Sequence, residues 1–105
     1  MKIPKEFYLK GKLWRVEYKW GLRDGDEMLD GLCTFDPRVI YLRRELSRED
    51  KWLTFLHELV HAILFECYIS RNDGGIDGIV EEVVCDSISE CFTELFEFRP
   101  KRKKI

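Results

Sequence analysis

The sequence of 105 residues predicts a single α+β domain, in which a small antiparallel sheet of three or four strands packs on two helices. Two observations lead to this fold class. Residues 7–42 alternate short β-prone runs with turn signals, whereas residues 47–98 hold two long helical patterns separated by a glycine-rich break. Because a chain of this length builds one hydrophobic core, we expect one domain over residues 1–98 and a basic tail at 99–105.

Two hairpins are expected in the N-terminal half. Lys10-Gly11-Lys12 and Asp36-Pro37-Arg38 have the composition of tight turns, and each lies between two apolar runs. The polar stretch 21–30, which joins the hairpins, is expected to be a loop. The predicted strands are residues 7–9, 13–20, 31–35 and 39–42.

The first helix is expected to begin after Ser47, which has the properties of an N-cap and is followed by two acidic residues. It should run to about Ile69. On a helical wheel His57 and His61 lie at one border of the apolar stripe, with Tyr68 on the same side, so that a second helix can close over them. The stripe that should pack on the sheet consists of Trp52, Leu56, Leu59, Val60, Ile63 and Cys67.

The second helix should follow a loop over residues 71–78, which contains three glycines. It is predicted to span about Ile79 to Phe98 and to end before Pro100.

The four cysteines form no Cys-x-x-Cys pair and lie in apolar segments, so we expect buried, reduced thiols and not disulfides or a second metal site. They are Cys33, Cys67, Cys85 and Cys91.

Charge is distributed unevenly along the chain. Five basic residues lie in the tail 99–105, which leaves 13 basic against 20 acidic residues in the remainder. An acidic body argues against binding to nucleic acid, and the tail is expected to be a solubilising terminus. Neither a signal peptide nor an apolar run of about 18 residues is visible. The sequence therefore predicts a cytoplasmic protein without membrane contact.

His57-Glu58-Leu59-Val60-His61 is the pattern that points to chemistry, and it contains both histidines of the chain. Histidines four residues apart on a helix share one face and can bind one metal ion. Glu58, between them, is placed to act as general base on a water at that metal. The alternative interpretation is a helix with two partly exposed histidines beside a salt-bridging glutamate.

A zinc ion held by two histidines needs a third protein ligand, and a carboxylate from Glu81 or Glu82 is expected. Glu82 is preferred because Asp86 follows it on the same helical face, where it can accept the outer N–H of a zinc-binding histidine. Glu81 is the fallback, since it falls among apolar positions, where a carboxylate without a partner would be costly. A solvated Glu-Glu pair near a helix start is the non-functional alternative.

The strand Val39–Leu42, the segment Leu56–Ile63 and Glu82-x-x-x-Asp86 together resemble a minimal gluzincin. Over about residues 31–95 the chain is most similar to the short ImmA/IrrE-like metallopeptidases that are common in phages and mobile elements. The resemblance implies a zincin fold that cleaves a peptide bond, often in a transcriptional repressor. It also implies Zn²⁺ bound by His57, His61 and Glu82, with Glu58 as the base and Asp86 orienting a histidine.

Larger zincins add a C-terminal subdomain that completes the cleft, whereas here about one helix follows the glycine-rich loop. An oxyanion donor would have to be Tyr68, Tyr41 or an arginine.

The leading hypothesis is a zinc metallopeptidase acting on a protein or peptide, which could add as a strand to the sheet edge. The second hypothesis is a non-enzymatic regulator that is stabilised by zinc and whose acidic surface binds a basic partner. Binding of nucleic acid through the basic tail is the weakest of the three hypotheses. Glu58 discriminates between the first two, because a structural site does not need it.

Overall fold

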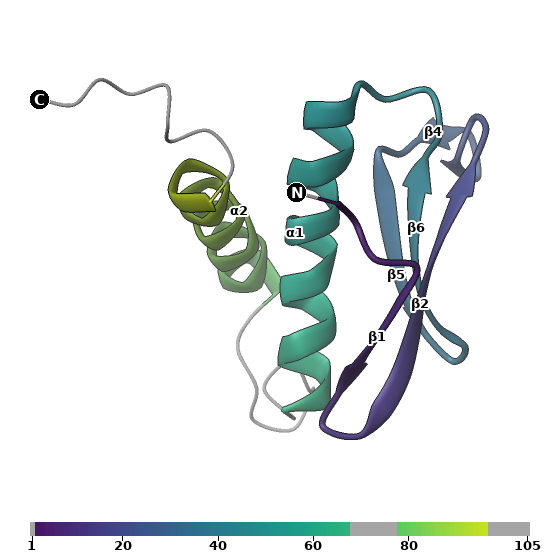
Figure 1. The fold of residues 1–105 in the computed structure, drawn as a ribbon. Helices are drawn as coiled ribbons and strands as arrows, with labels where there is room; N and C mark the ends of the chain where they lie inside the picture. The colour runs from purple at the N-terminus through teal and green to yellow at the C-terminus, as the bar shows by residue number, and fades with distance from the viewer. Residues whose placement is uncertain (1, 68–77, 97–105) are drawn as a thin grey trace, which may run out of the picture.

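The computed structural model describes residues 2–67 and 78–96. A four-stranded sheet forms one layer, helix α1 (Arg48–Glu66) packs on one of its faces, and helix α2 (Gly78–Phe96) packs on α1 (Figure 1). The predicted α+β class, with a four-stranded sheet and two helices, is confirmed. Predictions that concern Tyr68, residues 71–77 or the tail 99–105 lie outside the described residues.

The helices and strands lie close to their predicted positions. In the sheet, β1 and β2 form the first hairpin and β5 and β6 the second, and a further short hairpin, β3 and β4, occupies the predicted loop 21–30. The α1 helix ends at Glu66, about three residues earlier than expected, with Cys67 as its C-cap. The bounds are β1 (Glu6–Leu9), β2 (Lys12–Lys19), β3 (Arg23–Asp24), β4 (Glu27–Met28), β5 (Gly31–Phe35), β6 (Arg38–Arg43), α1 (Arg48–Glu66) and α2 (Gly78–Phe96).

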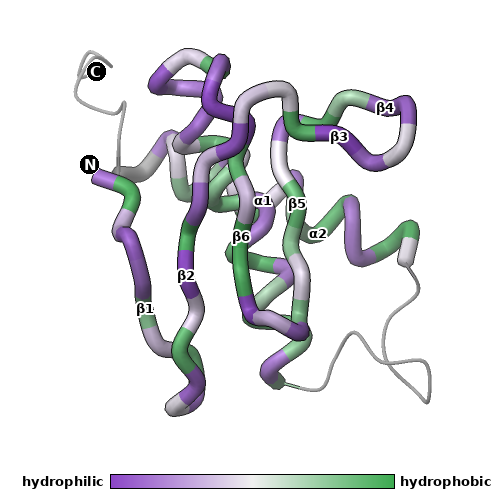
Figure 2. Tube along the Cα trace, turned by 90° about the vertical axis from the view of Figure 1, so that its right-hand side faces the viewer, coloured by the Kyte–Doolittle hydropathy of each residue, from purple (hydrophilic) through white to green (hydrophobic). Residues whose placement is uncertain are grey.

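The strand order in the sheet is β1-β2-β6-β5, and Figure 2 shows the four strands side by side in this order. Both hairpins are antiparallel, but β2 and β6 run parallel, with Val16 opposite Ile40. The expectation of a wholly antiparallel sheet is therefore wrong at this pair. The reason is burial: β6 carries three buried residues and takes a central position, which leaves the less buried β5 at the edge.

Local features account for the helix start and for the first turn. Ser47 accepts a hydrogen bond from the backbone N of Asp50 over 3.1 Å, as an N-cap does. Lys10 and Gly11 both have positive φ, 48° and 79°, which two-residue hairpins of type I′ require. The residues of the turn thus set the register of β1 against β2.

The hydrophobic core lies between the sheet and α1. Two predictions about burial are wrong: Ile63 and Cys67 are exposed, and Phe55 and Ala62 are buried in their place. All four cysteines are free, as expected, but Cys67 and Cys91 lie at the surface. The core residues are Trp14, Val16, Ile40, Leu42, Trp52, Phe55, Leu56 and Ala62.

Glu66 connects the end of α1 to the sheet. Its buried Oε2 accepts hydrogen bonds from Trp14 Nε1 over 2.9 Å and from Arg38 Nε over 2.5 Å. Burial alone would raise the pKa of this carboxyl, but the two hydrogen bonds outweigh it and the pKa is lowered. Neither helix in the described part of the chain is long and apolar enough to cross a membrane.

Candidate metal centre

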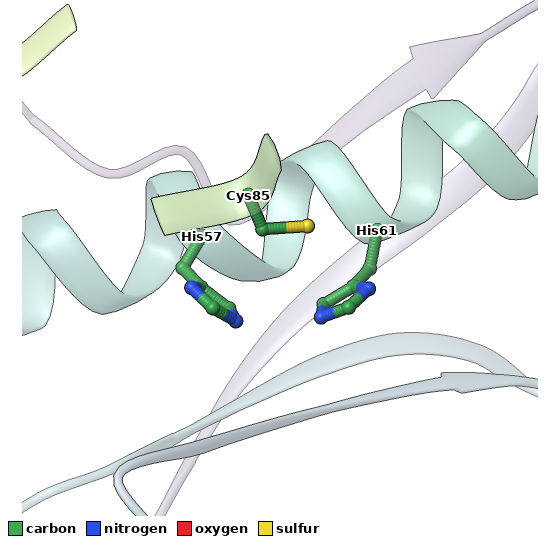
Figure 3. A group of neighbouring side chains, drawn as sticks. All are labelled: His57, His61 and Cys85. Atoms are coloured by element: carbon green, nitrogen blue, oxygen red, sulfur yellow. The ribbon is translucent and has the colours of Figure 1, made fainter. Parts of the chain in front are cut away.

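His57 and His61 lie one turn apart on the face of α1 that is turned toward α2 (Figure 3). The centres of their rings are 5.0 Å apart. Their side chains are 21% and 14% exposed, so both rings are largely shielded yet still accessible. Helical spacing therefore brings the two imidazoles together, as the sequence predicts.

Three carboxylates of α2 contact the four ring nitrogens. Glu82 lies between the rings, with Oε1 at 3.1 Å from His57 Nε2 and Oε2 at 3.0 Å from His61 Nε2. On the outer nitrogens, Asp86 Oδ1 is 2.8 Å from His57 Nδ1, and Glu81 Oε2 is 2.5 Å from His61 Nδ1. The three acidic residues thus divide into one that faces both Nε2 atoms and two that hold the Nδ1 atoms.

This donor set fits a zinc ion. Two imidazole nitrogens and one carboxylate, converging from two helices, are a common set of ligands for catalytic zinc. When Nε2 of a histidine binds a metal, Nδ1 carries the proton and donates it to a carboxylate, which orients the ring. Asp86 lies where that role was predicted. Glu81 lies in the same position on the second histidine, which the sequence pattern did not indicate.

Glu58 is buried, with 9% of its surface exposed, although its side chain carries a carboxyl group. Burial raises the pKa of its carboxyl, and the neighbouring His61 and His57 oppose that shift. Among the described residues no hydrogen bond or ion pair holds this carboxylate. The side chain lines both cavities beside the two histidines, a position that suits a role in binding or chemistry.

Two cavities, of about 430 and 630 Å³, meet at Gly31, His57 and Glu58. In the described part of the chain their charged lining is acidic apart from the histidines, and it contains no tyrosine, lysine or arginine. Tyr41, an expected oxyanion donor, lines a separate cavity beside Lys19. The acidic lining residues are Asp24, Glu27, Asp30, Glu58, Glu81, Glu82, Asp86 and Glu90.

Cys85 is a candidate ligand that sequence reasoning missed. Its Sγ and one ring nitrogen each of His57 and His61 all lie within 4.8 Å of one another (Figure 3). The side chain is fully buried, and burial, reinforced by nearby carboxylates, raises the pKa of the thiol to about 12. Cys85 is a buried, free thiol, as expected, but its position beside the two histidines was not anticipated. The spacing Glu82-x-x-Cys85, which puts both on one helical face, was the available signal.

Comparison with known protein families gives a match. Residues 21–75 match the model of the peptidase M78 family, described as the IrrE N-terminal-like domain, which is slightly more than half of the chain. The matched segment contains β5, β6 and α1 with both histidines, while Glu81, Glu82, Cys85 and Asp86 lie beyond its end. Neither the curated proteins nor the solved structures contain a match.

Proposed function

Because this chain belongs to the peptidase M78 family of IrrE N-terminal-like domains, we propose that it is a zinc-dependent metallopeptidase that cleaves a peptide bond in a protein partner. The family assignment agrees with the resemblance stated from the sequence. The observation that carries the proposal is the arrangement of one carboxylate, Glu82, on both Nε2 atoms beside the buried Glu58. Together these are the ligands and the base that such a reaction needs.

In this proposal His57, His61 and Glu82 hold the zinc. The support for Glu82 over Glu81 is positional, since Glu82 faces the inner nitrogens of both rings and Glu81 contacts only the outer nitrogen of His61. Glu81 and Asp86 would then each accept an Nδ1 proton. Each ring would be fixed in the tautomer that leaves Nε2 free to bind the metal.

Glu58 would act as the general base. Bound zinc supplies Lewis-acid activation of water and of the scissile carbonyl. The Glu58 carboxylate takes the proton of the attacking water and passes it to the amine of the leaving peptide. Its burial suits this role, because a carboxyl whose pKa is raised is a stronger base than an exposed one.

The substrate would bind along β5, the edge strand whose Leu32 and Cys33 line the larger cavity. An extended peptide can pair with the free edge of such a strand. The acidic lining favours a segment that carries lysine or arginine near the scissile bond, because a cleft of one charge sign attracts the opposite sign. Asp30 is partly neutralised by Arg43, at 2.7 Å, so the attraction should be greatest around Asp24 and Glu27.

A second function, a non-enzymatic module that zinc stabilises, is favoured by one observation. Cys85 offers a fourth donor near the histidines, and a zinc ion with four protein ligands is characteristic of structural sites. The acidic cavities would then bind a basic partner without cleaving it. In that case Glu58 would have no chemical task, and its replacement would leave the function intact.

The decisive experiment compares wild type with Glu58→Gln. Each is co-expressed with partner proteins, cleavage products are identified by mass spectrometry, and zinc content is measured on the purified proteins. We expect Glu58→Gln to keep one zinc per chain and to lose cleavage. The control is Glu90→Gln, which changes an exposed carboxylate of the same cleft and should still cleave. Equal cleavage by Glu58→Gln, or no cleavage by wild type, would overturn the peptidase proposal.

A further inference from the structure

The two helices offer matching pairs of donors to the space between them. On α1, His57 and His61 are four residues apart, and on α2, Glu82 and Cys85 are three apart, so each pair shares one helical face. Figure 3 shows the Cys85 sulfur directed into the space beside both imidazoles. The thiol is fully buried, and no hydrogen bond engages it within the described residues.

The distances are compatible with coordination after a small adjustment. In a tetrahedral zinc site, bond lengths of about 2.0–2.3 Å place neighbouring ligand atoms roughly 3.5 Å apart. The sulfur and the two nitrogens lie within 4.8 Å of one another. A movement of about 1 Å, which a change in side-chain torsions provides, would therefore bring the sulfur into bonding range of an ion that the histidines hold.

We propose that Cys85 is a fourth protein ligand of this centre, completing a closed set with His57, His61 and Glu82. The inference rests on the proposed zinc site. On coordination the thiol releases its proton to solvent, and the thiolate occupies the position that a water needs for catalysis. Cleavage by wild type therefore requires the sulfur to leave the metal and give this position to water.

Cobalt(II) substitution tests this directly, because a thiolate bound to cobalt gives an intense near-ultraviolet charge-transfer band that histidine and carboxylate ligands lack. Metal-free full-length protein is titrated with cobalt, and the spectrum is followed. We expect the band in wild type and its loss in Cys85→Ser. The other cysteines serve as controls, so the band should persist in Cys33→Ser, Cys67→Ser and Cys91→Ser.

A second measurement separates a ligand from a packing residue. By chelator competition, Cys85→Ser should weaken zinc binding by more than about 100-fold, beyond the 10–100-fold that outer-shell changes cost. Ser89→Ala is the matched control, because Ser89 is also buried on α2, 2% exposed, and should change zinc affinity little.

The possible outcomes distinguish this inference from the proposed function. Cobalt binding without a charge-transfer band, or with a band that survives in Cys85→Ser, would overturn the role of Cys85 and leave the set of two histidines and a glutamate in place. Failure of wild type to bind either metal would overturn both the inference and the zinc peptidase. Loss of the band in Cys85→Ser alone supports the closed centre.

Discussion

Gly31 on the edge strand β5 lies directly against Glu58 on α1. A β-carbon at Gly31 would come within 3.2 Å of Glu58 Cγ and within 2.5 Å of Thr54 Cγ2. Only a residue without a side chain allows this approach. The edge along which we propose the substrate binds is therefore held at a set distance from the proposed base.

Replacing Gly31 by alanine should push β5 and α1 apart. We expect Gly31→Ala to lower the free energy of unfolding by about 1–3 kcal/mol, as overpacking does, and to impair cleavage while zinc is retained. Urea unfolding, metal analysis and the cleavage assay measure these effects. Gly78→Ala is the control, since a β-carbon there meets nothing within 4 Å. It should change stability by less than about 1 kcal/mol.

The identity of the third ligand can be decided by two glutamine substitutions. Glu82→Gln should lose stoichiometric zinc, because its carboxylate faces both Nε2 atoms. Glu81→Gln should keep zinc with an affinity reduced by about 10–100-fold, as expected for a group that only orients His61. Metal analysis after gel filtration and chelator competition provide the readouts. The reverse pattern would assign the ligand to Glu81.

Asp86 is expected to tune the centre without binding the metal. Asp86→Ala removes the oxygen 2.8 Å from His57 Nδ1 and should weaken zinc affinity by about 10–100-fold. Glu90→Ala, one turn further along α2 and exposed, is the comparison and should leave affinity unchanged. Equal affinities for the two variants would make Asp86 an ordinary surface acid.

Glu66 should make stability depend on pH. Since its pKa is lowered in the folded state, its contribution is present above the unfolded value near 4.5 and is lost as the pH falls through the folded value. We expect Glu66→Gln to cost about 1–3 kcal/mol at pH 7 and to flatten the loss of stability in acid. Urea unfolding at a series of pH values tests this. Curves for mutant and wild type that stay parallel into acid would contradict it.

Those parts of the fold that depend on residues close together in the sequence were predictable. The Ser47 cap and the Lys10-Gly11 turn are local, and so are the two hairpins and both helices. The pairing of β2 with β6 was not predictable in this way. It depends on which strands, far apart in the chain, compete for the buried central position of the sheet. The alternation of apolar and polar residues within one strand does not indicate which strand will pair with it.

In the candidate site, too, local features were predictable from the sequence, whereas contacts between distant segments were not. The four-residue spacing of His57 and His61 on one helix is sufficient to predict that their rings lie close together. The roles of Glu81 and Glu82 depend on how α2 is rotated against α1, which a helical wheel of one helix leaves open. Cys85 was missed because a cysteine in an apolar segment is more often a packing residue than a ligand.

The parallel alignment of β2 and β6 has a consequence for how this cleft can change. The whole segment between them, residues 20–37, leaves the sheet centre and returns to it, carrying the β3–β4 hairpin and β5. Asp24 and Glu27 of that hairpin line the larger cavity but make no part of the core. Insertions or exchanges at this tip therefore alter the rim of the cleft while the packing of sheet and helix stays intact. For the proposed peptidase, this hairpin is therefore the place where substitutions would change substrate preference and leave the fold intact.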